Sequence, residues 1–345
     1  MKIYQFLETF SDGDAIGYHA MGIDRLLKSK NIKTAIYANN IEKKCVKIAK
    51  YYKDFKFDEE DNVLLFHHSI GSEVFEYVKN LSSIKKLIFH NITPPSYFRH
   101  RPDFMKMLEK GYRQLHEFDR VFTNSICDSE FNKSVLRSYG FKKKIEVIPP
   151  FVSLRDKFII SMKAKKPKKF RVLYVSQIAP HKNQKKLVKI FNTYQKYFNS
   201  NSELYIVGGY NLQDSYYQEL RGETGKNKSI YLTGRISLRK LKSLYQSSDL
   251  FLSMSEHEGF SVPLVEAMYF KLPIIAYEAG AVADTLKSGG VLLKSDNPLV
   301  VGAIIETIMK NKLIIKKIRL NQSKVMKLYK PLLIEKELLK WLVKN

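Results

Sequence analysis

Residues 250–266 read LFLSMSEHEGFSVPLVE, and this stretch decides how the chain is expected to fold. The apolar run Leu250–Met254 predicts a buried strand. Ser261 is a good N-cap, and Pro263 suits a first helical turn because its missing N–H would have no partner there, so a helix should begin near Val262. A strand followed through a polar loop by a helix is the repeating unit of a parallel sheet covered by helices.

The same alternation runs through both halves of the chain and breaks once between them. It predicts an α/β protein with two doubly wound, Rossmann-like domains, whose ligands lie beyond the carboxyl ends of the strands. In the first half we expect strands at Ile3–Leu7, Lys33–Ala38, Asn62–Phe66, Lys85–His90, Arg120–Thr123 and Ile145–Ile148. In the second half we expect them at Arg171–Ser176, Leu204–Val207, Ile230–Thr233, Leu250–Met254, Pro273–Tyr277 and Val291–Leu293.

Length also favours two domains, because 345 residues exceed one typical core. We assign residues 1–152 to the first domain and residues 170–320 to the second. Residues 153–169 are polar, lysine-rich and punctuated by proline, which is typical of a linker, although such a lysine cluster could instead contact anionic lipid. Residues 321–345 are helical in pattern and carry apolar side chains that need a surface to pack on.

Composition narrows the class of protein. Hydrophobic residues make up 44% and charged residues 27%, as in ordinary globular proteins, and no apolar run reaches the roughly 20 residues that span a bilayer. Met1–Glu8 lacks the pattern of a signal peptide. Two cysteines, Cys45 and Cys127, make neither a disulfide framework nor a zinc site, so a reducing, cytoplasmic setting is expected.

The net charge is +25, from 59 Lys and Arg against 34 Asp and Glu. Such a balance attracts polyanions: nucleic acid, an anionic lipid surface or a phosphorylated substrate. The lysines are scattered over the whole chain, so an AT-rich genome that fills exposed sites with lysine accounts for them equally well. No nucleic-acid recognition motif is present, and we expect no nucleic-acid partner.

The loop and helix start in residues 258–266 carry chemistry. The free N–H groups and the positive dipole end of a helix beginning near Val262 suit a diphosphate, and Gly259 allows close backbone approach. Glu258 before the helix and Glu266 one turn inside it could bind two sets of hydroxyls, as on a sugar and a ribose. The alternative is that Glu266 is an ordinary solvated helix residue.

The stretch SEHEGFSVPLVEAM at residues 255–268 resembles the E-x7-E signature of retaining glycosyltransferases of family four, also called glycosyl transferases group one. The following KLPIIAY at residues 271–277 is similar to the strand after that signature. The resemblance implies the GT-B fold, in which two Rossmann-like domains face each other across a cleft. It implies that Glu258 approaches the donor sugar, that Glu266 binds the ribose, and that the backbone of Phe260 and Ser261 contacts sugar or phosphate.

Two further loops of the second half agree with this family. VSQIAPHKN at residues 175–183 resembles its G-R-x-x-x-x-K loop, which clamps the diphosphate. Lys182 matches the lysine, whereas Gln177 stands where arginine is usual, so one positive charge is lost. Residues 234–236, Gly234, Arg235 and Ile236, resemble the loop that holds the base.

In the first half, SDGDAIG at residues 11–17 resembles the family's first glycine-containing loop, which faces the donor phosphates through Gly13 and Asp14. Residues 12–14 also read as a D-x-D metal motif, but GT-B enzymes do not normally need a bound metal, so we expect none, and we expect Asp14 to cap the first helix. His90 resembles the cleft histidine that contacts the donor sugar. His67 and His68 could line the acceptor side or could equally be packed or solvated.

The resemblance implies transfer of a hexosyl unit from a UDP- or GDP-sugar to a glycan or lipid-linked acceptor, with retention of configuration and without a cofactor. Cell-surface polysaccharide assembly at the inner membrane face is the leading expectation, and the terminal helix near Trp341 is expected to cross back onto the first domain. One alternative is a catalytically silent sugar-nucleotide or glycan-binding protein, which Gln177 favours. A sugar phosphorylase would need a pyridoxal-phosphate lysine, for which no signature is present.

Overall fold

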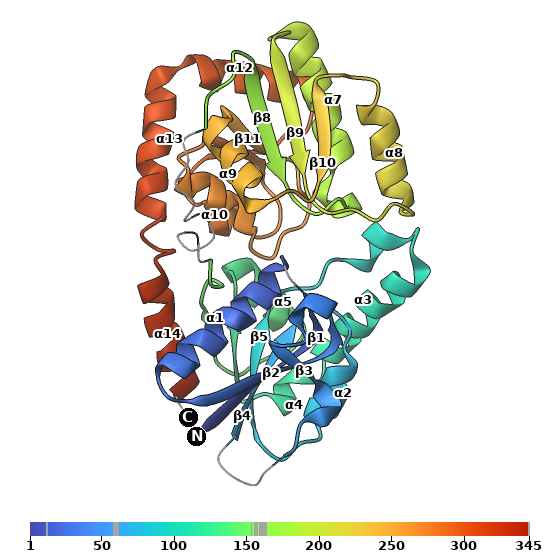
Figure 1. Ribbon diagram of the computed structural model, residues 1–345, viewed down its shortest axis with the longest axis vertical. Coiled ribbons are helices and arrows are strands. Elements are labelled where there is room, and N and C mark those ends of the chain that lie inside the picture. The colour runs from blue at the N-terminus through green and yellow to red at the C-terminus, as the bar shows by residue number, and fades with distance from the viewer. Residues whose placement is uncertain (12, 58–61, 153, 155–157, 159–163, 344–345) are drawn as a thin grey trace. The chain divides into compact units, whose positions relative to one another are not determined.

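The computed structural model describes residues 1–11, 13–57, 62–152, 154, 158 and 164–343. The chain divides into two compact units (Figure 1). Unit 1 comprises Met1–Val152 and Pro331–Asn345, and unit 2 comprises Ser153–Lys330.

Unit 1 is built on a seven-stranded parallel sheet in the order β3-β2-β1-β4-β5-β6-β7. Its strands are β1 Lys2–Phe10, β2 Lys33–Ile41, β3 Ala49–Tyr51, β4 Asn62–His68, β5 Ile84–Phe89, β6 Asn124–Cys127 and β7 Ile145–Val147. Its helices are α1 Ala15–Ser29, α2 Glu73–Val78, α3 Pro102–Leu115, α4 Phe118–Val121, α5 Glu130–Ser138 and α14 Pro331–Val343.

Unit 2 is built on a six-stranded parallel sheet in the order β10-β9-β8-β11-β12-β13. Its strands are β8 Phe170–Val175, β9 Ser202–Val207, β10 Ile230–Gly234, β11 Leu250–Ser253, β12 Ile274–Tyr277 and β13 Val291–Leu293. Its helices are α7 Gln184–Tyr197, α8 Ser215–Thr224, α9 Leu238–Ser247, α10 Val262–Tyr269, α11 Val282–Leu286, α12 Pro298–Lys310 and α13 Lys312–Val325. The expectation of two doubly wound parallel sheets is confirmed.

Alternation along the strands of unit 1 divides its core into two faces. Val63 and Leu65 of β4 pack with Leu27 of α1 and with Trp341 of α14. Phe66, the next residue, points to the opposite face, where its ring stacks 5.8 Å from that of Phe122. Successive side chains of a strand point to opposite faces. One face of the sheet therefore packs against α1 and α14, and the other packs against a layer of aromatic side chains.

The last helix is fixed to the sheet by a buried lysine. Lys86 of β5 is 2% exposed, and its Nζ donates to the carbonyls of Trp341 at 2.9 Å and Leu342 at 3.1 Å. Burial lowers the pKa of Lys86. The last carbonyls of a helix have no partner within it and attract a cation, so Lys86 caps α14 from the neighbouring strand.

Two sequence expectations about elements are wrong, and one strand was not expected. Residues 120–123 do not form a strand, because the chain makes the short helix α4 and then extends as β6. Phe118 and Phe122 are four residues apart, and a helical turn packs their rings edge to face, with Phe122 stacked on Phe66. The three-residue edge strand β3 was not expected, and the terminal helical pattern is divided into α13 and α14, since Pro331 starts a new helix.

The expected linker, residues 153–169, is only partly described. Residues 153, 155–157 and 159–163, including Lys163, lie outside the described residues. Phe158 is buried in unit 2, with its ring 5.0 Å from that of Phe270 and its carbonyl accepting from Lys242 Nζ at 2.7 Å. Lys166 pairs with Asp249 at 2.9 Å. These parts of the segment are therefore attached to unit 2.

The order of the strands marks where a ligand can bind. In unit 1, β1 lies between β2 and β4, and in unit 2, β8 lies between β9 and β11. The strand order reverses beside each of these central strands, and in open α/β sheets a ligand binds in the crevice beyond the carboxyl ends at such a point. Chemistry is therefore expected after β1 and β4 in unit 1 and after β8 and β11 in unit 2.

Candidate functional site

The loop between β11 and α10 presents a free helix start. Val262 begins α10 and Pro263 lies in its first turn, as the sequence predicts. Ser261 occupies the N-cap position, but it has φ 74° and its side chain caps no backbone N–H, so the expected capping hydrogen bond is wrong. A left-handed backbone at a residue other than glycine is costly and is found most often at functional sites. The helix start is therefore left without the usual side-chain cap.

Lys182 and Glu258 meet at the crevice of unit 2. Lys182 follows β8 and Glu258 follows β11, and the two side chains form an ion pair with Nζ 2.8 Å from Oε2. They are only 17% and 10% exposed, so both charges are largely withdrawn from water. The Coulomb attraction of such a pair is offset by the cost of desolvation. The pair is therefore better explained as a site prepared for a polar ligand than as a source of stability.

Backbone contacts hold Glu258 and its loop in place. The carbonyl of Glu258 accepts from the N–H of Ala281 at 2.9 Å. Gly280 has φ +54°, and a Cβ at this position would lie 2.6 Å from the Glu258 carbonyl oxygen. Only glycine satisfies both the backbone angle and the close approach, so the loop after β12 fixes the loop that carries Glu258.

A hydroxyl chain connects the two loops of the ion pair. Tyr174 of β8 is buried, and its hydroxyl donates to the Lys182 carbonyl at 3.0 Å. The Ser255 hydroxyl lies 2.6 Å from the Tyr174 hydroxyl oxygen. Because the Tyr174 proton is used toward Lys182, Ser255 is the donor in this second hydrogen bond. Glu256 N–H donates to the His181 carbonyl at 2.8 Å. These contacts fix the loops relative to each other and so set the Lys182–Glu258 distance.

Two histidines beside Lys182 stay neutral. Burial, followed by the charge of Lys182, lowers the pKa of His257 to about 4. Burial and Lys182 likewise lower the pKa of His181 well below its ordinary value. The two histidines therefore add no positive charge beside Lys182 at neutral pH.

Glu266 is buried, which rules out the solvated alternative. Its side chain is 1% exposed, and its Oε2 accepts a hydrogen bond from the Tyr245 hydroxyl at 2.7 Å. Burial, followed by the nearby Glu266 charge, raises the pKa of Tyr245 well above its ordinary value. A buried carboxylate needs hydrogen-bond donors, so Tyr245 of α9 positions Glu266 from the neighbouring helix.

The other expected donor residues lie on the loops around this crevice. Gln177 is exposed, and its carbonyl accepts from Gln184 Nε2 at 2.9 Å. Gly234 ends β10 with φ +69°, and exposed Arg235 and half-buried Ile236 follow it. Phe260 is buried beside Gly259, and its carbonyl accepts from the Thr285 hydroxyl. No ion pair among the described residues contains Arg235.

In unit 1, the loop after β1 leads into α1. Asp14 is the N-cap of α1, as expected, with its Oδ2 accepting from Gly17 N–H at 3.3 Å. Burial raises the pKa of Asp14, and the Gly17 hydrogen bond and the charge of His90 oppose that rise. Gly13 has φ +83°, which favours glycine. Asp12 lies outside the described residues, and among those described no group of three or more His, Cys, Asp or Glu could hold a metal ion.

His90 lies in a buried polar cluster that the sequence did not predict as a whole. Its Nδ1 is 2.8 Å from Asp128 Oδ2, and its Nε2 is 3.0 Å from His67 Nδ1. His67 Nε2 is in turn 3.0 Å from Gln5 Oε1. Asp128 and Gln5 were missed, although Asp128 directly follows β6 and so lies at the carboxyl edge of the sheet.

His67 and His68 are both packed rather than solvated. Because they are consecutive on β4, they point to opposite faces of the sheet. His67 joins His90, whereas the His68 ring lies 4.7 Å from that of Phe118 in the aromatic layer. Burial lowers the pKa of His68 to about 3. His68 therefore cannot line an acceptor site in this conformation.

No helix in the described part of the chain has both the length and the apolar composition that crossing a bilayer requires. Cys45 and Cys127 are both buried, and neither forms a disulfide. Burial, followed by the charge of Asp128, raises the pKa of Cys127. Cys127 is therefore not prepared as a nucleophile, because a thiolate needs an environment that lowers its pKa.

Solved structures share this fold over nearly the whole chain. Sucrose-phosphate synthase from Thermosynechococcus elongatus has a TM-score of 0.75 at 14% identity, with 99% of this chain and 98% of that chain covered. HepE from Anabaena, in complex with UDP-glucose, also has a TM-score of 0.75 at 14% identity, with 99% of each chain covered. At such low identity the likeness shows the GT-B fold alone.

Curated relatives match shorter parts. A probable sucrose-phosphate synthase of Thermosipho melanesiensis is 29% identical over 153 residues, which are 43% of this chain and 36% of that protein. The O-antigen chain mannosyltransferase RfbU of Salmonella typhimurium is 25% identical over 246 residues, 70% of this chain and 63% of that protein. Each match spans less than two thirds of the relative's length.

The family comparison covers unit 2, where the ion pair and α10 lie. Residues 156–325 match the family described as Glycosyl transferases group 1. Residues 156–325, which make up nearly all of unit 2, therefore belong to the glycosyl transferases group 1 family.

Proposed function

We propose that this protein is a retaining glycosyltransferase that moves a hexosyl unit from a nucleoside-diphosphate sugar to an acceptor hydroxyl. The observation that carries the proposal is the largely buried Lys182–Glu258 ion pair, whose Nζ and Oε2 are 2.8 Å apart. The pair lies beyond the strand ends of unit 2, beside the start of α10. A cation, an uncapped helix start and a carboxylate together fit a diphosphate joined to a sugar.

The main barrier in such a transfer is charge separation, because the sugar becomes cation-like while the diphosphate departs. Lys182 and the N–H groups at the start of α10 stabilise the leaving diphosphate. When Lys182 binds the diphosphate, Glu258 is released from the ion pair to hold the sugar hydroxyls and to favour the positive ring. In this scheme the departing phosphate accepts the proton of the acceptor hydroxyl on the same face.

Glu266 holds the ribose of the donor nucleotide, and Tyr245 keeps its carboxylate in place from α9. Gly234, Arg235 and Ile236 lie at the end of β10 and contact the base, mainly through backbone groups. Either UDP or GDP suits such a loop. The HepE complex with UDP-glucose makes a uridine donor a reasonable first choice for testing.

For the acceptor, we propose a glycan or a lipid-linked glycan of cell-surface polysaccharide assembly. The relatives that support this include RfbU and the capsular polysaccharide biosynthesis glycosyltransferase CapH of Staphylococcus aureus, 33% identical over 30% of this chain. An acceptor of this kind is anchored in a membrane, so the enzyme would work at the inner membrane face as a peripheral protein.

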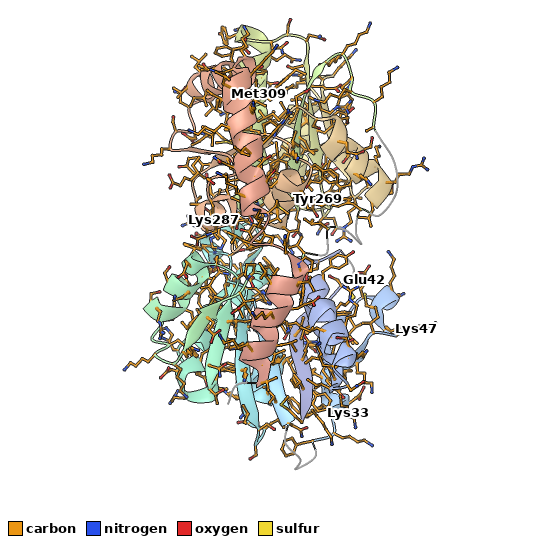
Figure 2. All side chains as sticks on the ribbon, turned by 90° about the vertical axis from the view of Figure 1, so that its left-hand side faces the viewer. Lys33, Glu42, Lys47, Tyr269, Lys287 and Met309 are labelled. Atoms are coloured by element: carbon orange, nitrogen blue, oxygen red, sulfur yellow. The ribbon has the colours of Figure 1, made fainter. Side chains whose placement is uncertain are left out.

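Helix α13 offers a surface for that membrane. Its sequence KLIIKKIRLNQSKV contains no acidic residue. Leu313 and Leu320 are 78% and 58% exposed, and the exposed Lys316 and Lys317 lie between them. Figure 2 is drawn from the side on which α13 lies, with Met309 and Tyr269 labelled on the same unit. Outward leucines among lysines on one helix are typical of helices that lie in the interface of anionic bilayers.

A catalytically silent sugar-nucleotide or glycan-binding protein is the alternative, and Gln177 is the observation that favours it. The Gln177→Arg variant tests this. An active enzyme should already turn over a donor and gain at most about tenfold from one added charge contact. Turnover that appears only in Gln177→Arg would favour the alternative.

The proposal is tested by incubating the full chain with UDP-, GDP- and ADP-sugars and measuring release of the nucleoside diphosphate. Wild-type protein should release it from one class of donor, faster when a matching acceptor is present. Glu258→Gln should bind that donor but release little product. Release that is equal in wild type and Glu258→Gln would contradict the role given to the ion pair.

A further inference from the structure

His90 uses both of its ring nitrogens within unit 1. Its Nδ1 is 2.8 Å from Asp128 Oδ2 and its Nε2 is 3.0 Å from His67 Nδ1. The His90 and Asp128 side chains are 4% and 6% exposed. Water therefore has little access to these hydrogen bonds, and the direction of each must be set by the neighbouring protein groups.

Gln5 fixes which atom donates and which accepts at one end of the hydrogen-bonded series Gln5–His67–His90–Asp128. Its Nε2 donates to the carbonyl of Ala20 at 3.0 Å, so its Oε1 is the atom that faces His67 Nε2, also at 3.0 Å. A carbonyl oxygen only accepts, so His67 Nε2 carries a proton. Gln5 is fully buried, and reversing its amide would bring two carbonyl oxygens together.

His67 is neutral, which fixes its second nitrogen. Burial, followed by the charge of His90, lowers the pKa of His67 well below its ordinary value. A neutral imidazole has one N–H and one acceptor nitrogen. With the proton on Nε2, His67 Nδ1 is the acceptor, and the hydrogen bond to it must come from His90 Nε2–H.

The other end of the hydrogen-bonded series is the carboxylate of Asp128. Asp128 Oδ2 accepts from His90 Nδ1–H, and Asp128 Oδ1 has no hydrogen-bond partner among the described residues. A buried carboxylate with so few donors needs a cation beside it. His90 therefore donates from both nitrogens, which only an imidazolium does.

Two further titratable groups, both from the start of α1 and its cap, lie near His90. Burial raises the pKa of the α1 cap residue Asp14. His19 of α1 lies with its ring 5.7 Å from that of His90. His19 Nδ1 accepts from Phe151 N–H at 2.9 Å, and burial lowers the His19 pKa, so it is neutral. Thus His90 faces two carboxylates and two neutral histidines.

We propose that Gln5, His67 and Asp128 are positioning residues that hold His90 as an imidazolium at the carboxyl edge of the unit 1 sheet. Both N–H groups are occupied, so His90 acts through its charge and not by proton transfer. A positive charge opposes a cation-like sugar and favours an anion, so the ligand chemistry that suits His90 is a phosphate. The charge state stands on the hydrogen-bond geometry together with the neutral His67, and its use rests on the proposed function.

The experiment is nitrogen NMR at pH 7 on the full chain, labelled with nitrogen-15 in its histidine rings and free of ligand. His90→Gln identifies the His90 signals. The expected result is that both ring nitrogens of His90 are protonated and that His67 has a proton on Nε2 only. A single proton on His90, with the other proton on Asp128 or absent, would overturn the proposal.

Two variants of Gln5 test the proposal without any substitution of Asp128. Gln5→Leu removes the acceptor, so His67 is free to donate from Nδ1 and His90 should fall to one ring proton. Gln5→Glu, protonated in this buried position, offers the same acceptor and the same donor, and His90 should keep two. If both variants keep two protons, Gln5 is not a positioning residue and the proposal is wrong.

Activity gives a separate readout. With a donor identified, Gln5→Leu should lower kcat about 10- to 100-fold, as loss of one charge contact to a leaving group does, and Gln5→Glu should restore most of it. An imidazolium found in a protein that transfers no sugar would sink the proposed function and leave the charge state standing. A singly protonated His90 in an active enzyme would do the reverse.

Discussion

The polar groups at the carboxyl edges of the two sheets differ in kind. In unit 2 they are a lysine and a carboxylate paired at 2.8 Å, still 17% and 10% exposed, on loops that leave two adjacent strands. In unit 1 they are histidines, an amide and Asp128, buried and joined in a hydrogen-bonded chain. The first arrangement can exchange one partner for a ligand, whereas the second holds one charge in a fixed state.

The largest expected effect on turnover comes from breaking the Lys182–Glu258 ion pair. Lys182→Ala removes the cation that we propose binds the diphosphate, and it leaves Glu258 as a nearly buried charge without its lysine. We expect donor turnover to fall about 100- to 1,000-fold, as when a group that stabilises developing charge is removed. The measurement is the rate of nucleoside diphosphate release at saturating donor.

Lys185→Ala is the matched control, because Lys185 lies one turn further along the chain and pairs with Glu219 in unit 2. It should change turnover less than twofold, since surface pairs contribute little. Equal losses in the two variants would mean that general positive charge, rather than the pair with Glu258, supports catalysis.

A second prediction concerns the support of Glu266. Tyr245→Phe keeps the buried ring and removes the hydroxyl that donates to Glu266 Oε2 at 2.7 Å. Leaving a buried carboxylate short of a donor should cost about 1–3 kcal/mol of unfolding free energy and weaken donor binding. Urea unfolding and donor titration measure the two effects.

Another tyrosine–glutamate pair in unit 2 separates stability from binding. Tyr194 donates to Glu306 Oε2 at 3.1 Å, away from the loops of the candidate site. Tyr194→Phe should lower stability without changing donor affinity. The assignment of Glu266 to the ribose would fail if Tyr245→Phe also left donor affinity unchanged.

The third prediction uses the neutral histidines of unit 1. The pKa of His68 is lowered to about 3 from an ordinary value of 6.5, so in the pH range between these values the unfolded chain binds a proton that the folded chain does not. The stability that His68 contributes is complete above pH 6.5 and is lost as the pH falls. From pH 6.5 to 5 the loss is about 2 kcal/mol.

Replacing His68 by leucine should remove this share of the acid sensitivity. The difference in unfolding free energy between pH 6.5 and pH 5 should shrink by about 2 kcal/mol in His68→Leu. His100 is exposed, and His100→Gln should leave the difference unchanged. An unaltered pH dependence in His68→Leu would show that His68 is not held neutral.

The smallest effect is expected at the surface of α13. Each lysine close to an anionic bilayer contributes about 1 kcal/mol, so Lys316→Gln should weaken binding to phosphatidylserine-containing vesicles about fivefold. Lys226→Gln, at an exposed position before β10, is the control and should have no specific effect. If both variants weaken binding alike, the net charge of the protein and not α13 attracts the vesicles.

The contrast between the two units also decides what the sequence could predict. The loops of unit 2 follow strands in a contiguous motif, and Val262 starts its helix where Ser261 and Pro263 place it. The cluster of unit 1 depends on the alignment of Gln5, His67 and Asp128 across four strands, which a single sequence does not specify. Only the paired strands bring residues so far apart in the chain within 3.0 Å of one another.

Local patterns failed where tertiary packing outweighed them. The run at residues 120–123 has strand-like composition, but edge-to-face packing of Phe118 on Phe122 favours a helical turn. Glu266 is polar in pattern and yet 1% exposed, because Tyr245 from α9 supplies its hydrogen bond. In both cases the deciding contact comes from the three-dimensional arrangement of aromatic side chains.

The most direct test of the central claim is a donor screen that compares wild type with Lys182→Ala at equal protein concentration. Nucleoside diphosphate release is followed for UDP-, GDP- and ADP-sugars, with and without glycan acceptors. The account predicts release from one donor class by wild type and a loss of at least about 100-fold in the variant. Equal release by both proteins, or tight donor binding with no release by wild type under any condition, would contradict it.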